Sequence, residues 1–439
     1  MVAAQRIAVV GSGISGLSCA WLLAQKHRVT LFEAGTYLGG HTNTVDVTVD
    51  GVSHPVDTGF LVYNSATYPN LCALFAHLQV ASVTTEMSFS VSLAEPDLEW
   101  SGSSLATLFA QKRNLLRPGF WRMLADIVRF NRDSVAWLDS HPDEGLSLRD
   151  FLAIGGYSRH FSEWYLLPMG AAIWSCPAAQ MLDYPLASFV RFCRNHGLLQ
   201  IRDRPLWRTV EGGAREYVKK LAAGLADVRL ATPVRALRRD GGGVRLATDH
   251  GSERFDQVVL ACHSDQAMAL LGQSATRELL GAIRYQPNRA VLHSDASLLP
   301  RDAALWSAWN YSAGKGNDER HHPVAVSYLI NRLQPLPFKT PVIVSLNPQR
   351  EPAADKVIAQ FDYAHPLFDG PALAAQRRLA AISGERGVWL CGAWTGYGFH
   401  EDGLKSALRV ANAMGCWAPW QDAGGETSLA PSAPDELAA

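Results

Sequence analysis

Three glycines near the N-terminus have the spacing of a loop that binds the diphosphate of a dinucleotide. Gly11, Gly13 and Gly16 follow the apolar run 6–10 and precede a helical apolar pattern over 17–25. In such a loop the first glycine permits a tight turn, the second lets the backbone approach the diphosphate, and the third lets helix and strand pack closely. The diphosphate would meet free N–H groups at the positive end of the helix. The predicted loop comprises Gly11, Ser12, Gly13, Ile14, Ser15 and Gly16.

Glu33 is the acidic residue that a dinucleotide site requires for the adenosine ribose. It comes directly after the apolar run 29–32, which predicts a second strand. It also follows Gly11 by about 20 residues, the usual distance for such a site. Its carboxylate can accept hydrogen bonds from ribose hydroxyls, and Ala34 beside it belongs to the same predicted site. Strand, glycine loop, helix and second strand together predict one βαβ unit. This context makes a chance glycine turn the weaker interpretation.

Blocks elsewhere in the chain distinguish a flavin site from a nicotinamide site, which the glycine loop alone does not. These blocks cover residues 38–42, 57–60, 392–397 and 401–407. They resemble the glycine pair, the D-x-G segment and the C-terminal flavin motif of the flavin amine oxidase superfamily. Residues 211–213 and 228–234 resemble the middle segments that complete its cofactor domain.

The resemblance implies FAD as the cofactor and extends the predicted site beyond the glycine loop. Val234 would contact the adenine half through its backbone, and a helix over 404–414 would direct its N-terminal N–H groups at the flavin. The implied residues are Gly39, Gly40, His41, Thr42, Thr58, Gly59, Phe60, Val234, Gly392, Trp394, Gly403 and Leu404.

The implied fold class is α/β, with a Rossmann-like, glutathione-reductase-like FAD-binding domain and a second, amine-oxidase-like α+β substrate domain. We assign residues 1–65, 205–265 and 385–416 to the FAD-binding domain. Residues 66–204 and 266–384 form the substrate domain, with helices over 104–138, broken near Pro118, and over 146–196. Residues 417–439 are predicted to be a disordered tail, because Gly, Ser, Pro and Ala dominate its end.

Histidines replace several residues that are frequent in amine oxidases. His41 follows the glycine pair, where many members carry arginine. His293 takes the place of a lysine near the flavin, and His400 that of a tyrosine facing it. Because histidine can titrate near neutral pH and move protons, His400 and His293 are the predicted catalytic residues. A structural role for either histidine is the alternative.

Residues 57–64, 68–70 and 398–403 resemble a narrower bacterial and plant subgroup. Its members occur beside, or fused to, cyclopropane-fatty-acid-synthase-like methyltransferases, which implies a lipid substrate and a partner methyltransferase. We therefore expect an FAD-dependent oxidoreductase that desaturates or isomerises a fatty-acyl chain. The alternatives are a flavin amine oxidase and a non-catalytic flavin-bound partner of a lipid-modifying enzyme. The aromatic runs 164–174 and 306–311 are candidate pocket walls.

Composition limits the partners and the location. Lys and Arg number 40 against 41 Asp and Glu, so the chain lacks the basic surplus that nucleic acid requires. Its seven scattered cysteines form no metal-binding pattern, predict no metal and favour a cytoplasmic protein. No apolar run is long enough to span a bilayer. Residues 112–122 join cations to Leu, Phe and Trp and are a candidate peripheral membrane element; a solvated helix pair is the alternative.

Overall fold

The computed structural model describes residues 3–141, 145–200, 204–314 and 324–421. The first apolar run forms β1 (Arg6–Val10), the central strand of a five-stranded sheet with the order β10-β2-β1-β14-β20. All four pairings in this sheet are parallel. Strands buried on both faces read as continuous apolar runs, which explains the pattern in β1. The remaining strands are β2 (Arg28–Phe32), β10 (Asp227–Arg229), β14 (Gln257–Leu260) and β20 (Val388–Leu390).

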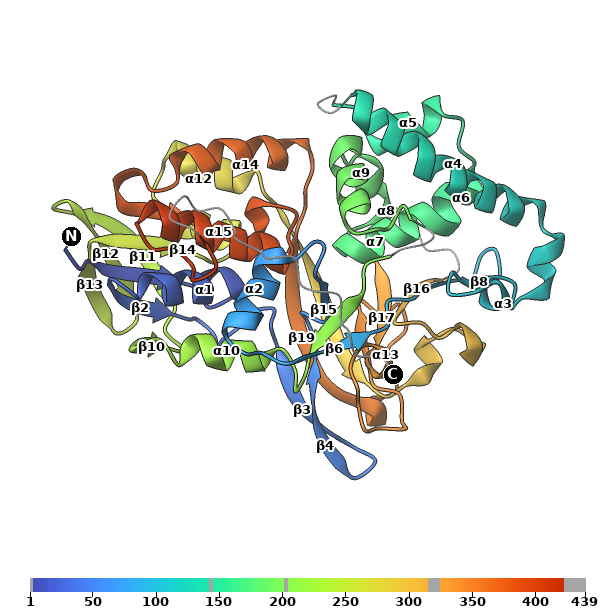
Figure 1. Cartoon of the computed structure of the whole chain (residues 1–439), viewed down its shortest axis with the longest axis horizontal. Coiled ribbons are helices and arrows are strands. Elements are labelled where there is room, and N and C mark those ends of the chain that lie inside the picture. The colour runs from blue at the N-terminus through green and yellow to red at the C-terminus, as the bar shows by residue number, and fades with distance from the viewer. Residues whose placement is uncertain (1–2, 142–144, 201–203, 315–323, 422–439) are drawn as a thin grey trace.

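Helix α1 (Ile14–Leu23) follows the glycine loop and is buried along nearly its whole length. It packs between the five-stranded sheet and α15 (His400–Ala413), and α10 (Arg215–Ala222) also contacts it. This half of the molecule lies on the left in Figure 1. The Rossmann-like α/β unit predicted from the sequence is thus confirmed.

A three-stranded antiparallel sheet extends from the cofactor half. It consists of β11 (Val234–Asp240), β12 (Gly243–Thr248) and β13 (Gly251–Phe255). Gly241 and Gly242 both have positive φ, as a tight hairpin turn of this type requires.

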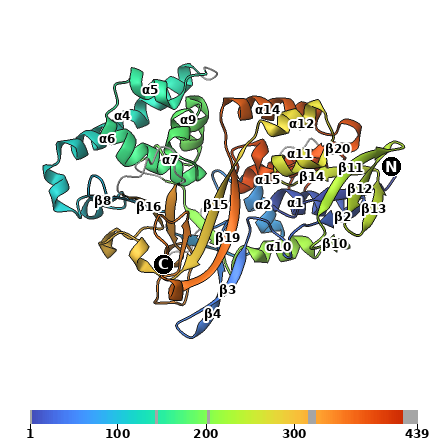
Figure 2. The ribbon, with the colours of Figure 1, turned by 180° about the vertical axis from the view of Figure 1, so that it is seen from behind.

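A seven-stranded mixed sheet forms the second half, with the order β19-β15-β18-β17-β16-β7-β8. Its long strands β15 and β19 run between the cofactor half and the helices α4 to α9 (Figures 1 and 2). This is the predicted α+β substrate half. The strands are β7 (Phe89–Leu93), β8 (Leu98–Ser101), β15 (Tyr285–His293), β16 (Trp309–Ala313), β17 (Ala325–Leu329), β18 (Ile343–Leu346) and β19 (Val357–Pro366).

The helical part is more broken than the sequence pattern predicts. Residues 104–117 form only α3 (Leu105–Leu108) and a 3₁₀ turn (Lys112–Leu116), and Pro118 is the first residue of α4 (Pro118–Ser140). Proline suits a first helical position because it has no N–H to donate. The stretch 146–196 divides into short helices: α5 (Leu148–Ile154), α6 (Arg159–Phe161), a π-helical turn (Ser162–Leu166), α7 (Leu167–Trp174), α8 (Ala178–Leu182) and α9 (Leu186–Asn195).

Several elements outside the predicted cofactor segments nevertheless pack on the cofactor half. Helix α2 (Pro69–His77) shares a core with α1 and α15, while α12 (Ala275–Gly281) and α14 (Gly370–Ile382) cover β1 and β14 from the other side. Helix α11 (Ser264–Leu270) lies with them. The remaining elements are α13 (Ile330–Leu333), the hairpin β3 (Thr44–Val49) and β4 (Val52–Asp57), and β5 (Tyr63–Asn64), β6 (Ser82–Thr85) and β9 (Trp207–Val210).

The beginning of the predicted disordered tail is packed. Ala418 is buried, and the ring of Trp420 stacks on Trp21 at 6.3 Å between centroids. The prediction is therefore wrong for residues 417–421, because an indole and a small residue find a place on α1. Residues 422–439 lie outside the described part of the chain. Within the described ranges, no helix combines the length and apolar character needed to cross a membrane.

Candidate cofactor and substrate cavity

A cavity of about 1280 Å³ lies where the two halves meet. The cofactor half lines it with the glycine loop and Val234, and the substrate half with residues such as Trp100, Gly102 and Ser103. We call these two parts the cofactor end and the substrate end. Binding sites for drug-sized ligands occupy about 300–1,000 Å³. The volume therefore suits a large cofactor together with a second molecule.

The glycine loop has the geometry that its spacing predicts. Gly11 has φ +101°, and a Cβ there would lie 2.9 Å from the carbonyl oxygen of Ala261. A Cβ at Gly16 would lie 1.9 Å from the carbonyl oxygen of Gly11, so this glycine permits the close contact of helix and strand. A Cβ at Gly13 would meet nothing within 4 Å, because it would project into the cavity. The three glycines thus have three separate reasons to lack a side chain.

Glu33 is held in place by the glycine loop. One of its carboxylate oxygens accepts hydrogen bonds from the backbone N–H of Ser12 at 2.9 Å and from its hydroxyl at 2.5 Å. The other accepts the N–H of Gly35 at 2.7 Å. Glu33 and Ala34 both line the cavity, so the carboxylate is fixed beside the position predicted for the adenosine ribose.

The cavity brings most of the predicted site residues together. Those that line it are Gly11, Ser12, Gly13, Ile14, Ser15, Glu33, Ala34, Gly39, Gly40, His41, Thr58, Gly59, Phe60, Val234, Gly392, Trp394 and His400. Gly16, Thr42, His293, Gly403 and Leu404 lie outside this lining.

Gly403 and Leu404 support the site from behind. A Cβ at Gly403 would lie 2.7 Å from Ile14 and 2.8 Å from the Ser15 hydroxyl, so this glycine lets α15 cross α1 closely. The side chain of Leu404 is completely buried in the core shared by both helices. Their predicted contact with the cofactor stays a prediction, and the structure gives both residues a packing role as well.

Helix α15 begins at His400, not after Gly403 as the sequence pattern predicts. The carboxylate of Asp402 accepts the N–H groups of Tyr397 and Phe399, both at 3.1 Å, which fixes the helix start one turn earlier. The helix terminus at the cavity is therefore formed by residues 397–400, all of which line it.

His41 is one of three neighbouring imidazoles in the cavity wall. Its ring centroid lies 5.6 Å from that of His263 and 5.4 Å from that of His365. Burial, together with the nearby histidines, lowers the pKa of His41 well below its ordinary value. Among the described residues, no protein group forms a hydrogen bond with its buried Nε2. Such an unpaired buried atom favours a ligand partner in the cavity.

His400 lines the cavity in a tightly packed setting. Its ring stacks on Phe60 at 3.6 Å between centroids, and its Nε2 is hydrogen-bonded to the hydroxyls of Thr42 at 2.9 Å and Tyr217 at 3.2 Å. Burial lowers the pKa of His400 to about 3. The expectation of titration near neutral pH is therefore wrong, because this apolar surrounding penalises the charged imidazolium.

His293 belongs to the interior of the seven-stranded sheet. It is completely buried, its Nδ1 accepts the N–H of Asp295 at 3.0 Å, and its Nε2 lies 2.8 Å from the Ser345 hydroxyl. Burial lowers the pKa of His293 to about 4, so it too is neutral at physiological pH. The structure therefore brings His400 to the cavity but leaves His293 in a hydrogen-bond network behind it.

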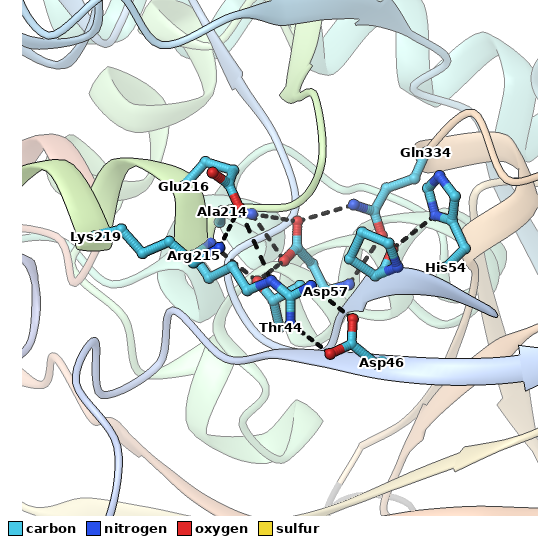
Figure 3. Close-up of polar contacts among 10 residues, drawn as sticks. Thr44, Asp46, His54, Asp57, Ala214, Arg215, Glu216, Lys219 and Gln334 are labelled. Atoms are coloured by element: carbon cyan, nitrogen blue, oxygen red, sulfur yellow. Dashed lines mark hydrogen bonds and ion pairs between the residues drawn. The ribbon is translucent and has the colours of Figure 1, made fainter.

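Asp57 is a buried carboxylate directly behind the cavity-lining residues Thr58, Gly59 and Phe60. It accepts the Ala214 N–H at 2.9 Å, the Gln334 amide at 2.9 Å and the Thr44 hydroxyl (Figure 3). Burial raises the pKa of Asp57 to about 7, although these hydrogen bonds act in the opposite direction. Asp57 thus joins the start of α10 and the substrate half to one wall of the site.

The end of the cavity remote from the glycine loop is apolar and aromatic. Both aromatic runs of the sequence contribute, through residues 165–174 and Trp309. The lining side chains there are Met87, Phe89, Trp100, Tyr165, Met169, Ile173, Trp174, Phe192, Trp309, Tyr328 and Leu346. Glu33 and Asp362 are the only carboxylates among the described lining residues, and Glu33 lies at the opposite end. This end can surround a hydrocarbon, and it offers few carboxylates to a cationic substrate, whereas Arg204 also lines it.

Several cavity residues have no counterpart in the sequence motifs. The hydroxyls of Tyr363 and Thr58 share a hydrogen bond at 2.8 Å, and the Tyr363 hydroxyl also accepts the Asn43 amide N–H at 3.1 Å. Tyr363 lies with His365 on β19, a strand without a recognisable motif. His263 could have been found, because it lies three residues after the end of β14, and ligands of parallel sheets bind at the carboxyl ends of the strands.

The geometry defines a flavoprotein-like dinucleotide site joined to an apolar chamber. Comparison with known proteins agrees with this assignment. Residues 14–292 match the family model of flavin containing amine oxidoreductases. The chain belongs to this family. It is 30% identical over 312 residues to a carotenoid phi-ring synthase of Streptomyces griseus, covering 65% of this chain but only 58% of that relative.

Solved structures show the same fold. A putative protoporphyrinogen oxidase from Exiguobacterium sp. 255-15 superposes with a TM-score of 0.67 at 17% identity, covering 94% of this chain and 99% of that one. A CLA-producing fatty acid isomerase from P. acnes gives a TM-score of 0.66 at 14% identity, covering 93% of this chain and 98% of that one. The predicted fold class and superfamily are confirmed.

The family is one of flavin containing oxidoreductases, and the residues that line the cavity fit FAD as the flavin. Gly13, with open space where a Cβ would lie, and His41, whose Nε2 has no partner among the residues that the structure describes, both line the cofactor end. When bound, FAD supplies a hydride acceptor. The glycine loop and the start of α1 would hold the diphosphate, Glu33 would orient the ribose, and residues 397–400 would meet the flavin end. The aromatic wall excludes water from the reacting region.

Proposed function

We propose that this oxidoreductase acts on the hydrocarbon chain of a fatty-acyl or similar lipid substrate, which it desaturates or isomerises. The observation that carries the proposal is the apolar, aromatic end of the cavity, continuous with the cofactor end. A hydrocarbon gains free energy from leaving water there, and it needs no charged partner. Two similar proteins, a fatty acid isomerase and a carotenoid phi-ring synthase, support this substrate class.

The chemistry requires a proton acceptor as well as a hydride acceptor. Desaturation removes a hydride and a proton from adjacent carbons, and the electrons then pass to oxygen or a quinone-like acceptor. Isomerisation returns the hydrogen at another carbon. His400 is our candidate proton carrier, because it is the predicted catalytic histidine that lines the cavity. Its lowered pKa keeps the imidazole neutral and able to accept a proton, which the hydrogen-bonded hydroxyls of Thr42 and Tyr217 would relay onward.

Anaerobic titration tests the proposal. The purified protein is mixed without oxygen with phospholipid, free fatty acid, a polyene and a primary amine in separate samples. Bleaching of the flavin by a lipid, with a new double bond in the extracted product, supports desaturation. A moved double bond with the flavin still oxidised supports isomerisation. Bleaching by amines alone would make the protein an amine oxidase.

The same titration addresses a non-catalytic role. A flavin that no compound reduces, with lipid products unchanged, would contradict the proposal and favour a flavin-bound partner protein. The partner methyltransferase implied by the sequence resemblance stays a prediction. Its test is co-purification of the two proteins from a host that expresses both.

A further inference from the structure

An exposed apolar patch lies at the far end of the helical part. Leu105, Leu115, Leu116 and Trp121 have 77%, 48%, 87% and 50% of their surface exposed, and we call them the α3–α4 patch. They are contiguous. The indole N–H of Trp121 donates to the carbonyl of Leu115 at 2.9 Å, and its ring lies 5.3 Å from Phe109, one helical turn after Leu105.

The segment beneath the patch is folded with its polar residue inward. Asn114 is completely buried, whereas the next two residues, Leu115 and Leu116, face outward. Arg117 holds this turn by donating to the Asp97 carbonyl at 2.9 Å, and Asn114 donates to the Glu99 carbonyl at 3.4 Å. The leucines are therefore held outward by specific hydrogen bonds. An arrangement that exposes leucine while burying asparagine favours an apolar environment outside the protein.

Exposed cations flank the patch, and two of them pair with carboxylates at its edge. Residues 101–125 contain four cations, Lys112, Arg113, Arg117 and Arg122, and no Asp or Glu. Arg113 is paired with Asp97 at 2.6 Å, and Arg122 with Asp126 at 3.2 Å. Lys112 and Arg122 are exposed beside the leucines. Cations that flank exposed Leu and Trp match a surface of anionic lipid headgroups over acyl chains.

The patch adjoins the cavity. Gly102 and Ser103 line the cavity, are exposed, and immediately precede α3. Trp100, at the end of β8, also lines it and packs on Phe120 of α4 at 6.5 Å between ring centroids. Any surface on which the α3–α4 patch docks would therefore lie beside the exposed cavity-lining residues Gly102 and Ser103.

We propose that the α3–α4 patch docks the protein on an anionic lipid bilayer and places the opening at Gly102 and Ser103 against the acyl chains. The inference rests on the proposed lipid substrate for its purpose, but not for its test. Leu105, Leu115, Leu116 and Trp121 insert among the acyl chains, while Lys112 and Arg122 contact the phosphates.

Vesicle sedimentation tests the docking without turnover. The FAD-loaded protein is spun with vesicles of phosphatidylcholine alone or with one quarter phosphatidylglycerol. We expect binding to the anionic vesicles, and a loss of about 10-fold or more in the partition coefficient for Leu115→Ser/Leu116→Ser. Lys112→Glu should weaken binding to anionic vesicles specifically. The matched control is Val52→Ser, 44% exposed at the β3–β4 hairpin, which should bind like wild type.

The outcomes separate the two proposals. Wild-type protein that stays in the supernatant with both vesicle types would overturn the docking, whatever the substrate. Equal binding of wild type and the double leucine variant, both with full FAD content, would also overturn it. A concentration-dependent dimer that the leucine variant abolishes would make the patch a protein interface instead. If the protein binds the vesicles but no lipid reacts in the anaerobic titration, the docking proposal stands and the proposed substrate is rejected.

Discussion

The two ends of the cavity are built in different ways. The cofactor end depends on backbone geometry, since Gly11, Gly13 and Gly16 matter through their missing side chains. The substrate end depends on bulky side chains from strands and helices far apart in the sequence. Backbone geometry requires particular residues at fixed spacing, whereas an apolar wall accepts many side chains of similar size. Substitutions should therefore remove the cofactor at one end and change turnover at the other.

The largest effect is expected at Gly13. Gly13→Val should abolish FAD binding but leave a folded protein, because its side chain would enter the cavity without meeting protein atoms. Gly16→Val should instead prevent correct folding, since even a Cβ would lie 1.9 Å from the Gly11 carbonyl. Flavin content and far-ultraviolet circular dichroism distinguish the two results. Full flavin content in Gly13→Val would place the diphosphate elsewhere.

Turnover should depend on His400 and not on His293. His400→Ala should keep FAD but lose turnover by roughly 10²–10⁴-fold, as expected for a positioned acid or base. His293→Ala should keep turnover but destabilise the fold by about 1–3 kcal/mol, because it leaves buried partners unpaired. Thermal unfolding and product formation are measured for both. Because the pKa of His400 is about 3, wild-type activity should show no step from it near pH 6.5.

Glu33 should have a moderate effect at the cofactor end. Glu33→Ala should weaken FAD binding by roughly 10- to 150-fold, which corresponds to about 1.5–3 kcal/mol for one charge-assisted site. Glu33→Gln should lose less, since its amide oxygen can still accept from Ser12. Isothermal titration of the flavin-free proteins gives the affinities. Unchanged affinity in the alanine variant would remove Glu33 from the ribose site.

Asp57 should affect stability more than binding or turnover. Its pKa is about 7 in the folded protein and about 3.9 when unfolded, so the folded state binds more protons between these values. The free energy of unfolding should therefore fall as the pH rises from about 4 to about 7. Urea unfolding of Asp57→Asn should show a smaller fall over that range. An equal pH dependence in both proteins would show that Asp57 does not titrate there.

The sequence by itself determined the cofactor end. The glycine spacing, Glu33 and the C-terminal motif predicted a cofactor fold and a loop whose geometry the structure reproduces, because short-range backbone constraints leave a local pattern. It did not determine the start of α15, since Asp402 fixes that terminus through hydrogen bonds to Tyr397 and Phe399.

Only the tertiary structure decided which histidines face the cavity. The sequence predicts both His400 and His293 as catalytic residues, yet one lines the cavity and the other hydrogen-bonds within a sheet. The grouping of His41 with His263 and His365 is likewise invisible in the sequence. The physical reason is that burial and long-range contacts set both the position and the pKa of a histidine, and neither is encoded by its neighbours along the chain.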